Sequence, residues 1–315
     1  PHGILISGGE VTKAKLFVNN TTGDVGLVGY WDVVAYDEFA GKSKKSDQGM
    51  IDIMKNYMAN KSFSRGTQVY GASASMVFVG NTDNSVPYML SHSNLFEALP
   101  KDYYDTAFLD RIHAYIPGWE VDKLRNEMFS NGYGFVVDYL AEILKELRKE
   151  DRTNEYAEHF ELSDNITIRD KTAIAKTYAG LLKIIFPAGE PTLDERKNIM
   201  EFAIELRRRV KLQLLKMDDT FEEVGFVYRV KGSSKFKEVL TLEEIQYLGR
   251  EAIFGNITED AAAKGVEESS QESKNEVKPK AQLVSKHFEI YDNMTGISYE
   301  KMFGEYLKGA RQIQI

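Results

Sequence analysis

Two adjacent carboxylates, Asp37 and Glu38, follow a short apolar run inside the segment WDVVAYDEFAGKS. At the end of a buried strand, such a pair can hold Mg²⁺ through its waters and accept the proton of an attacking water. The same segment ends in Gly41-Lys42-Ser43, which copies the tail of a phosphate-binding loop. The two interpretations exclude each other, because the first needs residues 33–36 in a strand and the second places residues 36–43 in a loop.

The chemistry of the loop favours the strand interpretation. A phosphate-binding loop begins with a glycine, so that backbone N–H groups can surround the phosphates. Here that position holds Tyr36, and the loop would contain two carboxylates that repel a triphosphate. We therefore expect Asp37 to be the Mg²⁺ ligand and Glu38 the general base. A third interpretation, in which both acids only cap a strand, stays open. The sequence contains no other G-x-x-x-x-G-K-[ST] pattern, so the phosphate loop of any ATP site is expected upstream of Pro1.

Three further residues follow in a meaningful order. Asn81 comes after the apolar run MVFVG, where an amide can orient the attacking water or contact the γ-phosphate. Arg111 follows a short apolar helix, and Arg169 opens a longer helical pattern. Each arginine taken alone is more simply explained as a surface or salt-bridged residue. An acid pair, a polar strand end, an arginine before a helical region and an arginine within it form the layout of an AAA+ ATPase.

The elements that must position these residues indicate a layered α/β unit. Apolar runs without clean alternation at residues 3–9, 25–38 and 75–83 predict strands buried on both faces of a parallel sheet. Helical spacing at residues 10–20 and 50–60 places helices between them. The predicted fold class is α/β, a parallel sheet of the P-loop NTPase type that is incomplete at its N-terminus, with the site at the carboxyl ends of the strands.

The remainder of the chain changes character after the sheet. Long helical patterns begin near Trp119, and residues 258–280 are rich in Glu, Ser and Lys without any aromatic residue, which is typical of a disordered linker. Because the first residue is Pro1 rather than Met, we expect a fragment of a longer protein. The expected domains are an AAA+ core at 1–118, a helical lid at 119–217, a post-lid segment at 218–257, the linker at 258–280 and the start of a truncated C-terminal α/β domain at 281–315.

The composition excludes several classes of protein. The 315 residues contain 48 acidic and 40 basic side chains, a net charge of -8, which argues against a uniformly basic protein that coats nucleic acid. The absence of cysteine excludes disulfides, thiolate catalysis and Cys-ligated zinc. No apolar run approaches the about 20 residues that cross a membrane, so we expect a cytoplasmic protein without membrane contact.

Basic residues are concentrated in two places. Lys61 and Arg65 flank Phe63 in NKSFSRGTQ. We expect this segment to be a loop that projects toward the central channel of a ring of subunits. There the two cations would contact DNA phosphates, and the Phe63 side chain would stack on bases or wedge between them. An ordinary solvated loop is an equal alternative. The run ELRRRVK at 205–211 is better explained as a helix face paired with nearby acids.

Seven segments carry a resemblance to a known family: LISGGEVTKAKLF, VGLVGYWDVVAYDEFAG, IMKNYMANKSFSRG, MVFVGNTD, LDRIHAYIPGWE, NGYGFVVDYLAEILKELRK and YAGLLKIIFP. They resemble the BrxL family, the Lon-protease-like AAA+ proteins of BREX bacteriophage-defence systems. The resemblance extends over residues 1–228.

The resemblance implies an ATPase that forms a hexameric or higher homo-oligomeric ring and acts on double-stranded DNA in phage exclusion, with other BREX components as further partners. It also implies ATP and Mg²⁺ as cofactors. The roles that it implies are Asp37 and Glu38 as the Walker B acids, Asn81 as sensor 1, Arg111 as an arginine finger offered to a neighbouring subunit and Arg169 as sensor 2. The chain lacks the family's Walker A segment and amino-terminal domain, so we expect the isolated fragment to be inactive.

Two other functions remain alternatives. A Lon-type protease uses a Ser-Lys pair in a Gly- and Ala-rich setting, and the sequence supplies none. The segment GASAS, Gly71 to Ser75, resembles a nucleophile elbow but leads into a strand, which favours small residues packed beside a sheet. In the second alternative, a non-hydrolysing ring only encloses DNA. The presence of Glu38 favours the hydrolysing ATPase.

Overall fold

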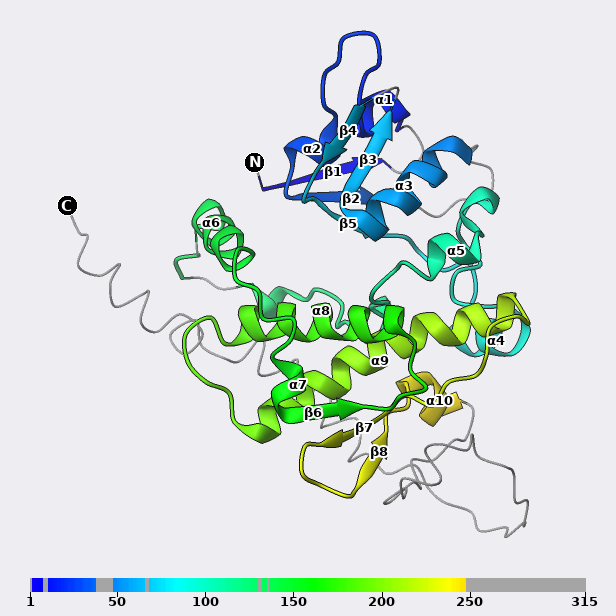
Figure 1. Ribbon diagram of the computed structural model, residues 1–315, viewed down its shortest axis with the longest axis vertical. Coiled ribbons are helices and arrows are strands. Elements are labelled where there is room, and N and C mark those ends of the chain that lie inside the picture. Colours follow the sequence, from blue (N-terminus) through cyan, green and yellow to red (C-terminus); the bar gives the residue numbers. More distant parts are fainter. Residues whose placement is uncertain are drawn as a thin grey trace, which may run out of the picture. The chain divides into compact units, whose positions relative to one another are not determined.

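The computed structural model describes residues 2–7, 11–37, 48–65, 68–129, 132–134 and 136–247. Contacts divide these residues into a first unit, residues 2–148 with Leu206–Glu223 and residues 241–247, and a second unit, Lys149–Glu205 with Val224–Leu240. Figure 1 shows the elements of both units. This division differs from the expected boundaries at 118 and 217, which stay predictions. The expected linker and C-terminal domain lie outside the described residues.

A parallel sheet forms the centre of the first unit (Figure 1). Its strands are β1 (Gly3–Ser7), β2 (Val33–Asp37) and β5 (Ser75–Phe78), with β2 in the middle. Both pairings are parallel, and they place Gly3 and Ser75 beside Val33. The predicted mixed α/β fold with a parallel sheet is thereby confirmed.

Helices and a hairpin connect these strands. The short helices α1 (Lys13–Leu16) and α2 (Leu27–Tyr30) lie between β1 and β2 in the chain, and α3 (Gln48–Asn60) precedes an antiparallel hairpin of β3 (Ser62–Arg65) and β4 (Gln68–Gly71). Thr12 caps α1 by accepting a hydrogen bond from the Lys15 N–H, as expected for threonine at this position.

The strands are not buried on both faces, contrary to the sequence-based expectation. Val34 and Tyr36 of β2 are buried, whereas Leu5 of β1 is 63% exposed and Val77 of β5 is 42% exposed. In the part of the chain that the structure describes, the apolar residues of α3 pack against Val34 and Tyr36. The apolar runs therefore predicted that β1, β2 and β5 exist, but not the cover of their second face. The run at 25–38 is also not a strand throughout, because Leu27–Tyr30 forms α2 and only Val33–Asp37 forms β2.

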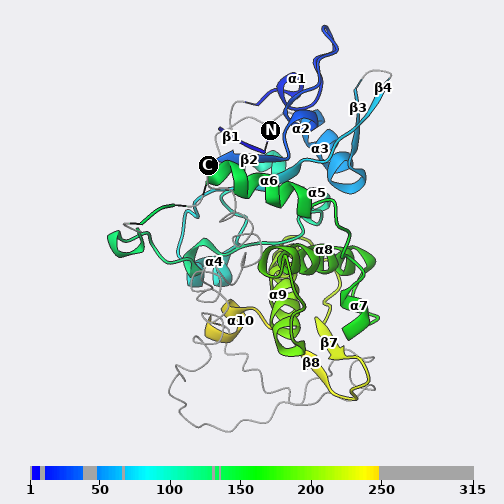
Figure 2. The same cartoon turned by 90° about the vertical axis from the view of Figure 1, so that its left-hand side faces the viewer.

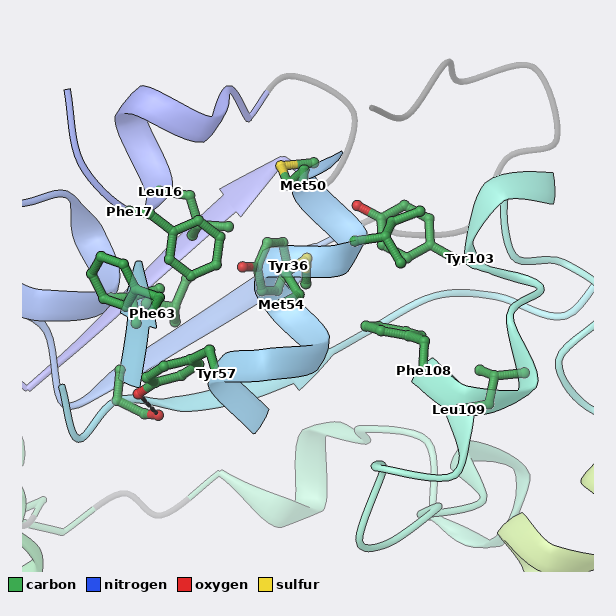
Figure 3. Close-up of a cluster of buried hydrophobic side chains, with 14 of the residues drawn as sticks. Leu16, Phe17, Tyr36, Met50, Met54, Tyr57, Phe63, Tyr103, Phe108 and Leu109 are labelled. Atoms are coloured by element: carbon green, nitrogen blue, oxygen red, sulfur yellow. Dashed lines mark hydrogen bonds between the residues drawn. The ribbon is translucent and has the colours of Figure 1, made fainter. Parts of the chain in front are cut away.

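The core of the first unit is rich in aromatic side chains. Figure 3 shows Tyr36 of β2 beside Met54 of α3, and Phe17 close to Phe63, with 5.0 Å between their ring centroids. The apolar positions of α3 recur at helical spacing: Met50, Ile51, Met54 and Tyr57. This buried face accounts for the helix, because the burial of apolar side chains is its main source of stability.

The first unit also contains α4 (Val86–His92), α5 (Thr106–Leu109), α6 (Val137–Leu147) and α10 (Leu242–Tyr247), with short 3-10 turns at Lys101–Tyr103, Gly118–Glu120 and Asn126–Met128. Arg148, at the end of α6, donates hydrogen bonds to the carbonyl oxygens of Asp32, at 2.8 Å, and of Ser73. Because these residues precede β2 and β5, Arg148 fixes the end of α6 at the amino ends of two sheet strands.

The second unit combines helices with a small antiparallel sheet. Helix α8 (Ile168–Ile185) lies beside the first half of α9 (Leu193–Met217), as Figures 1 and 2 show. The sheet has the order β6-β7-β8, formed by β6 (Phe160–Leu162), β7 (Val227–Val230) and β8 (Phe236–Glu238). Helix α7 (Tyr156–His159) directly precedes β6. No described helix combines the length and the apolar character that a membrane crossing requires.

Candidate active site

Asp37 and Asn81 lie at the same edge of the parallel sheet. Asp37 is the last residue of β2, half-buried, and pairs in register with Ser7 of β1. Beyond β5, the Val79 N–H donates to the Tyr36 carbonyl at 2.8 Å, which brings the chain that leads to Asn81 alongside the end of β2. Asn81 is exposed. The edge therefore presents a carboxylate and an amide from neighbouring strands.

Tyr36 fixes the strand beneath Asp37. Its ring stacks on Phe78 of β5 at 5.0 Å between centroids, and its side chain is 1% exposed. Burial raises the pKa of the Tyr36 phenol well above its ordinary value. Tyr36 is therefore a neutral core residue inside a paired strand, which agrees with the acidic strand end and disagrees with a loop at this position. Glu38 and Gly41-Lys42-Ser43 lie outside the described residues.

A single carboxylate at this edge fits Mg²⁺ of the kind used in nucleotide sites. Such an ion keeps several waters and binds one or two carboxylates together with phosphate oxygens. Asp37 can supply that carboxylate. Among the described residues no three His, Cys, Asp or Glu side chains gather into a protein-only metal site.

Arg111 lies in the turn that follows α5. Asp105 caps this helix by accepting a hydrogen bond from the Phe108 N–H at 3.0 Å, and Lys55 of α3 pairs with Asp105 at 2.7 Å. The Arg111 side chain is half-buried, and its Nη1 donates to the Ala107 carbonyl. Its Nε is buried and has no hydrogen-bond partner among the described residues. Within that part of the chain the guanidinium meets no carboxylate.

The second half of α9 contains three consecutive buried arginines, each paired with a carboxylate. Arg207 contacts Asp110 at 2.6 Å, Arg208 contacts Glu244 at 2.7 Å and Arg209 contacts Glu243 at 3.0 Å. The expected pairing of this basic run with acids is confirmed, but the three arginines are buried and their acids are not nearby in the chain. The sequence did not predict which acids, because the partners lie 34 to 97 positions away in the chain.

Helix α10, which supplies Glu243 and Glu244, was missed by the sequence analysis. Its start is a capping box: the Glu244 N–H donates to Thr241 Oγ1 at 3.2 Å, and the Thr241 N–H donates to the Glu244 carboxylate at 2.9 Å. A threonine followed three residues later by a glutamate is the sequence signal that indicates such a start. The same signal, Thr192 with Glu195, marks the beginning of α9.

Arg169 belongs to the second unit. It lies in the first turn of α8, behind the cap formed by Thr167, whose side chain accepts a hydrogen bond from the Asp170 N–H at 3.2 Å. Its side chain is exposed. The expected position at the start of a helix is therefore correct, while its role as sensor 2 stays a prediction.

The expected loop around Lys61 and Arg65 is instead the hairpin β3–β4. Phe63 is 1% exposed and packs among Phe17, Tyr57 and Tyr70, so its ring is part of the core and not a surface for stacking. This burial corrects the expectation of an exposed wedge. Lys61 is exposed, and the structure does not describe the Arg65 side chain.

The segment Gly71–Ser75 connects β4 to β5 and is buried only at Ala74. Ala74 is fully buried, and its carbonyl accepts hydrogen bonds from the Tyr57 hydroxyl at 2.6 Å and from Lys61 Nζ at 3.1 Å. A small side chain suits position 74, because the residue is enclosed and its carbonyl is held by two donors. The interpretation as small residues beside the sheet agrees with this packing.

The comparisons with known proteins agree with this geometry. Residues 1–227 match the family model described as "Lon-like protease BrxL-like, ATPase domain". Two proteins named "Lon-like protease BrxL" are each 46% identical to the chain: one from Bacillus cereus (strain H3081.97) over 246 residues, 78% of this chain and 36% of the relative, and one from Escherichia coli O9:H4 (strain HS) over 229 residues, 72% and 33%. The chain thus spans about a third of the length of these relatives. The resemblance seen in the sequence is confirmed, and the chain belongs to the BrxL-like ATPase family.

Proposed function

We propose that the chain carries the hydrolytic part of an AAA+ ATP site. The observation that supports this most strongly is the edge of the parallel sheet, where Asp37 ends β2 and Asn81 follows β5. In open α/β sheets, ligands bind outside the carboxyl ends of the strands. A carboxylate that can bind a metal and an amide that can position water are two of the parts that recur in sites of phosphoryl transfer.

Each residue at this edge has a distinct proposed role. Asp37 would hold a Mg²⁺ ion that arrives with ATP, and such an ion would supply positive charge beside the transferred phosphate. Glu38, the next residue in the chain, accepts the proton of the attacking water. Asn81 orients that water or contacts the γ-phosphate. The roles divide the reaction between one metal ligand, one base and one neutral donor.

Arg111 and Arg169 supply positive charge. The Arg111 guanidinium meets no carboxylate among the described residues, so it keeps its charge for an anionic ligand. We propose that it acts on the ATP of a neighbouring subunit, within a homo-oligomeric ring of six or more subunits, and that Arg169 contacts the ATP of its own subunit. An arginine supplied from a neighbour stabilises the transition state of phosphoryl transfer.

The proposed work of the ring is on double-stranded DNA in anti-phage defence, together with other BREX components. The membership of the BrxL-like family supports this proposal, and so does the exposed Lys61 at the base of the hairpin β3–β4. The relatives are named proteases, but the Gly71–Ser75 segment leads into strand β5 and not into the helix that follows a nucleophile elbow. We do not propose a protease centre in this chain.

The test is hydrolysis of ATP by the full-length protein and by its Glu38→Gln variant. The variant keeps the shape of the side chain and loses the base, so nucleotide binding is expected to persist while hydrolysis falls by at least about 10²-fold. Glu158→Gln, the same change at an exposed position of α7, is the matched control and is expected to hydrolyse ATP like the parent. Unchanged hydrolysis by Glu38→Gln would remove Glu38 from the site.

A further inference from the structure

We propose that Arg207 is a positioning residue for Arg111. This inference rests on the proposed function and deepens it. From α9, the Arg207 guanidinium contacts the residue before Arg111 and the residue after it. The side chain that is to meet the phosphate is therefore held through the backbone on both of its sides.

Three hydrogen bonds from Arg207 hold the backbone on both sides of Arg111, and we call this group of bonds the bracket. Nη1 of Arg207 donates to the carbonyl oxygens of Asp110, at 3.0 Å, and Ile112, at 2.6 Å. Nη2 donates to Oδ1 of Asp110 at 2.6 Å. A planar guanidinium can make such bonds at once because its donors point in fixed, diverging directions.

The bracket completes the hydrogen bonds of a helix end. The N–H groups of Asp110, Arg111 and Ile112 donate back to Thr106, Phe108 and Leu109 at 2.9 to 3.0 Å, so the amides of this turn are satisfied by α5 itself. The last carbonyls of a helix have no acceptor role within it. Arg207 supplies donors to two carbonyls of the turn, which fixes the direction in which the turn leaves α5.

Burial makes this arrangement stiff. Arg207 is fully buried and Asp110 is 6% exposed, so water does not compete for these bonds. Removing either charge would leave the other buried without compensation, which is strongly unfavourable. The turn that carries Arg111 is thus tied to α9, although the two segments are almost a hundred residues apart in the chain.

The consequence is a requirement on geometry. Arg111 can stabilise the transition state only if its guanidinium lies close to the phosphate oxygens on which negative charge develops. A misplacement of about 1 Å can lower the rate by about 10²-fold. We expect Arg207 to act on kcat through Arg111 without touching ATP. Its loss should leave the affinity for ATP close to that of the parent.

The test is Arg207→Lys in the full-length protein, compared with Arg208→Lys. Lysine keeps the charge beside Asp110 but lacks the planar fork from which Nη1 and Nη2 of Arg207 reach the three acceptors. We expect kcat to fall about 10-fold to 100-fold with little change in KM. The control makes the same substitution at the next position of the same helix, where the partner is Glu244 of α10 and not the Arg111 turn. It is expected to lose thermal stability but to keep its kcat.

Mixed rings separate a positioning role from general damage. If Arg207 acts through an arginine given to a neighbour, Arg207→Lys subunits mixed with Glu38→Gln subunits should hydrolyse ATP faster than either alone. Equal kcat for Arg207→Lys and Arg208→Lys, or no gain on mixing, would overturn the inference. Should Arg207→Lys fail to fold, the double variant Arg207→Met, Asp110→Asn removes both charges together. Because it also removes the bonds to both carbonyl oxygens, a lower kcat at unchanged KM is again expected.

Arg111→Ala distinguishes a failure of the proposed role of Arg111 in hydrolysis from a failure of the positioning role of Arg207. If Arg111→Ala hydrolyses ATP like the parent, Arg111 has no role in hydrolysis, and the bracket has nothing to position. If Arg111→Ala loses activity while Arg207→Lys matches its control, only the positioning role is contradicted.

Discussion

The arginines around the α5 turn differ in what their charge meets. Arg207, Arg208 and Arg209 are buried, and each contacts a carboxylate at 2.6 to 3.0 Å. Arg111 lies within the turn that Arg207 holds, but among the described residues its guanidinium contacts only the Ala107 carbonyl. A buried cation matched by an acid is part of the fold, whereas a half-buried cation without one keeps its charge for an incoming anion. The contrast separates structural arginines from the candidate for chemistry.

Arg111→Ala should have the largest effect. An arginine that stabilises the phosphoryl transition state contributes about 10³-fold or more to kcat, so hydrolysis is expected to fall by at least that factor while the protein remains folded. Arg125→Ala is the control, since Arg125 is an exposed arginine whose partner is Asp122 at 3.5 Å. If Arg111→Ala lost as much stability as substitutions of the buried arginines, Arg111 would be a structural arginine like them.

Arg209→Leu should destabilise the fold. It leaves Glu243, 3% exposed, without its cation, which is expected to cost about 3–5 kcal/mol. The double variant Arg209→Leu, Glu243→Leu removes both charges and should recover most of the loss, because an apolar pair of similar size can replace a buried ion pair. Thermal unfolding of the three proteins measures this. No recovery in the double variant would mean that the pair is not the source of the effect.

The Lys55–Asp105 pair should make the stability of the α5 region depend on pH. Burial acts to raise the pKa of Asp105, but its hydrogen bonds from Lys55 and from the Phe108 N–H outweigh burial and lower it below the ordinary 3.8. A lowered pKa adds stability above pH 3.8 that is lost as the pH falls through the folded-state value.

Asp105→Asn removes the charge and keeps a residue that can cap the helix. We expect a loss of about 0.5–1 kcal/mol near neutral pH, and the difference from the parent should shrink as the solution is acidified toward the lowered pKa. Thermal unfolding across this pH range measures it. A difference that grows on acidification would contradict the sign of the shift.

The smallest effect is expected at the hairpin. Replacing Lys61 and Arg65 by glutamine should flatten the dependence of DNA affinity on salt, since each phosphate contact adds about 0.9 to the slope of log affinity against log salt. Part of the Lys61 charge is occupied locally, because its Nζ also donates to the Ala74 carbonyl and lies 5.3 Å from the centre of the Tyr57 ring. Lys101→Gln, at another exposed lysine, is the control. An unchanged slope would place the DNA elsewhere.

The sequence predicted the elements whose signals are local. Apolar runs indicated β1, β2 and β5, helical spacing indicated α3, and the helical pattern that Arg169 opens indicated α8. Asp37 and Asn81 follow from where two strands end. The small antiparallel sheet was missed, because its strands have three or four residues and Phe160 pairs with Val230, 70 positions away. Short strands that pair over such distances carry no periodic signal of their own.

Local sequence patterns also gave wrong predictions where a polar segment contains side chains that are buried in the fold. Phe63 sits between Lys61 and Arg65, so the sequence indicated a surface loop, while alternation along β3 turns its ring into the core. The run of three arginines indicated a paired helix face, but nothing local connects Arg207 with the carbonyls of the α5 turn. Such contacts depend on tertiary packing, which a single sequence does not show.

Mixed assembly of Glu38→Gln and Arg111→Ala subunits of the full-length protein tests whether Arg111 acts on the ATP of a neighbouring subunit. The two residues are proposed to act on the same ATP from different subunits, so some interfaces in a mixed ring contain an intact copy of both. We expect the mixture to hydrolyse ATP faster than either variant alone, and the rate to be highest when the two variants are present in about equal amounts. Activity that never exceeds that of the two variants would contradict an arginine donated between subunits.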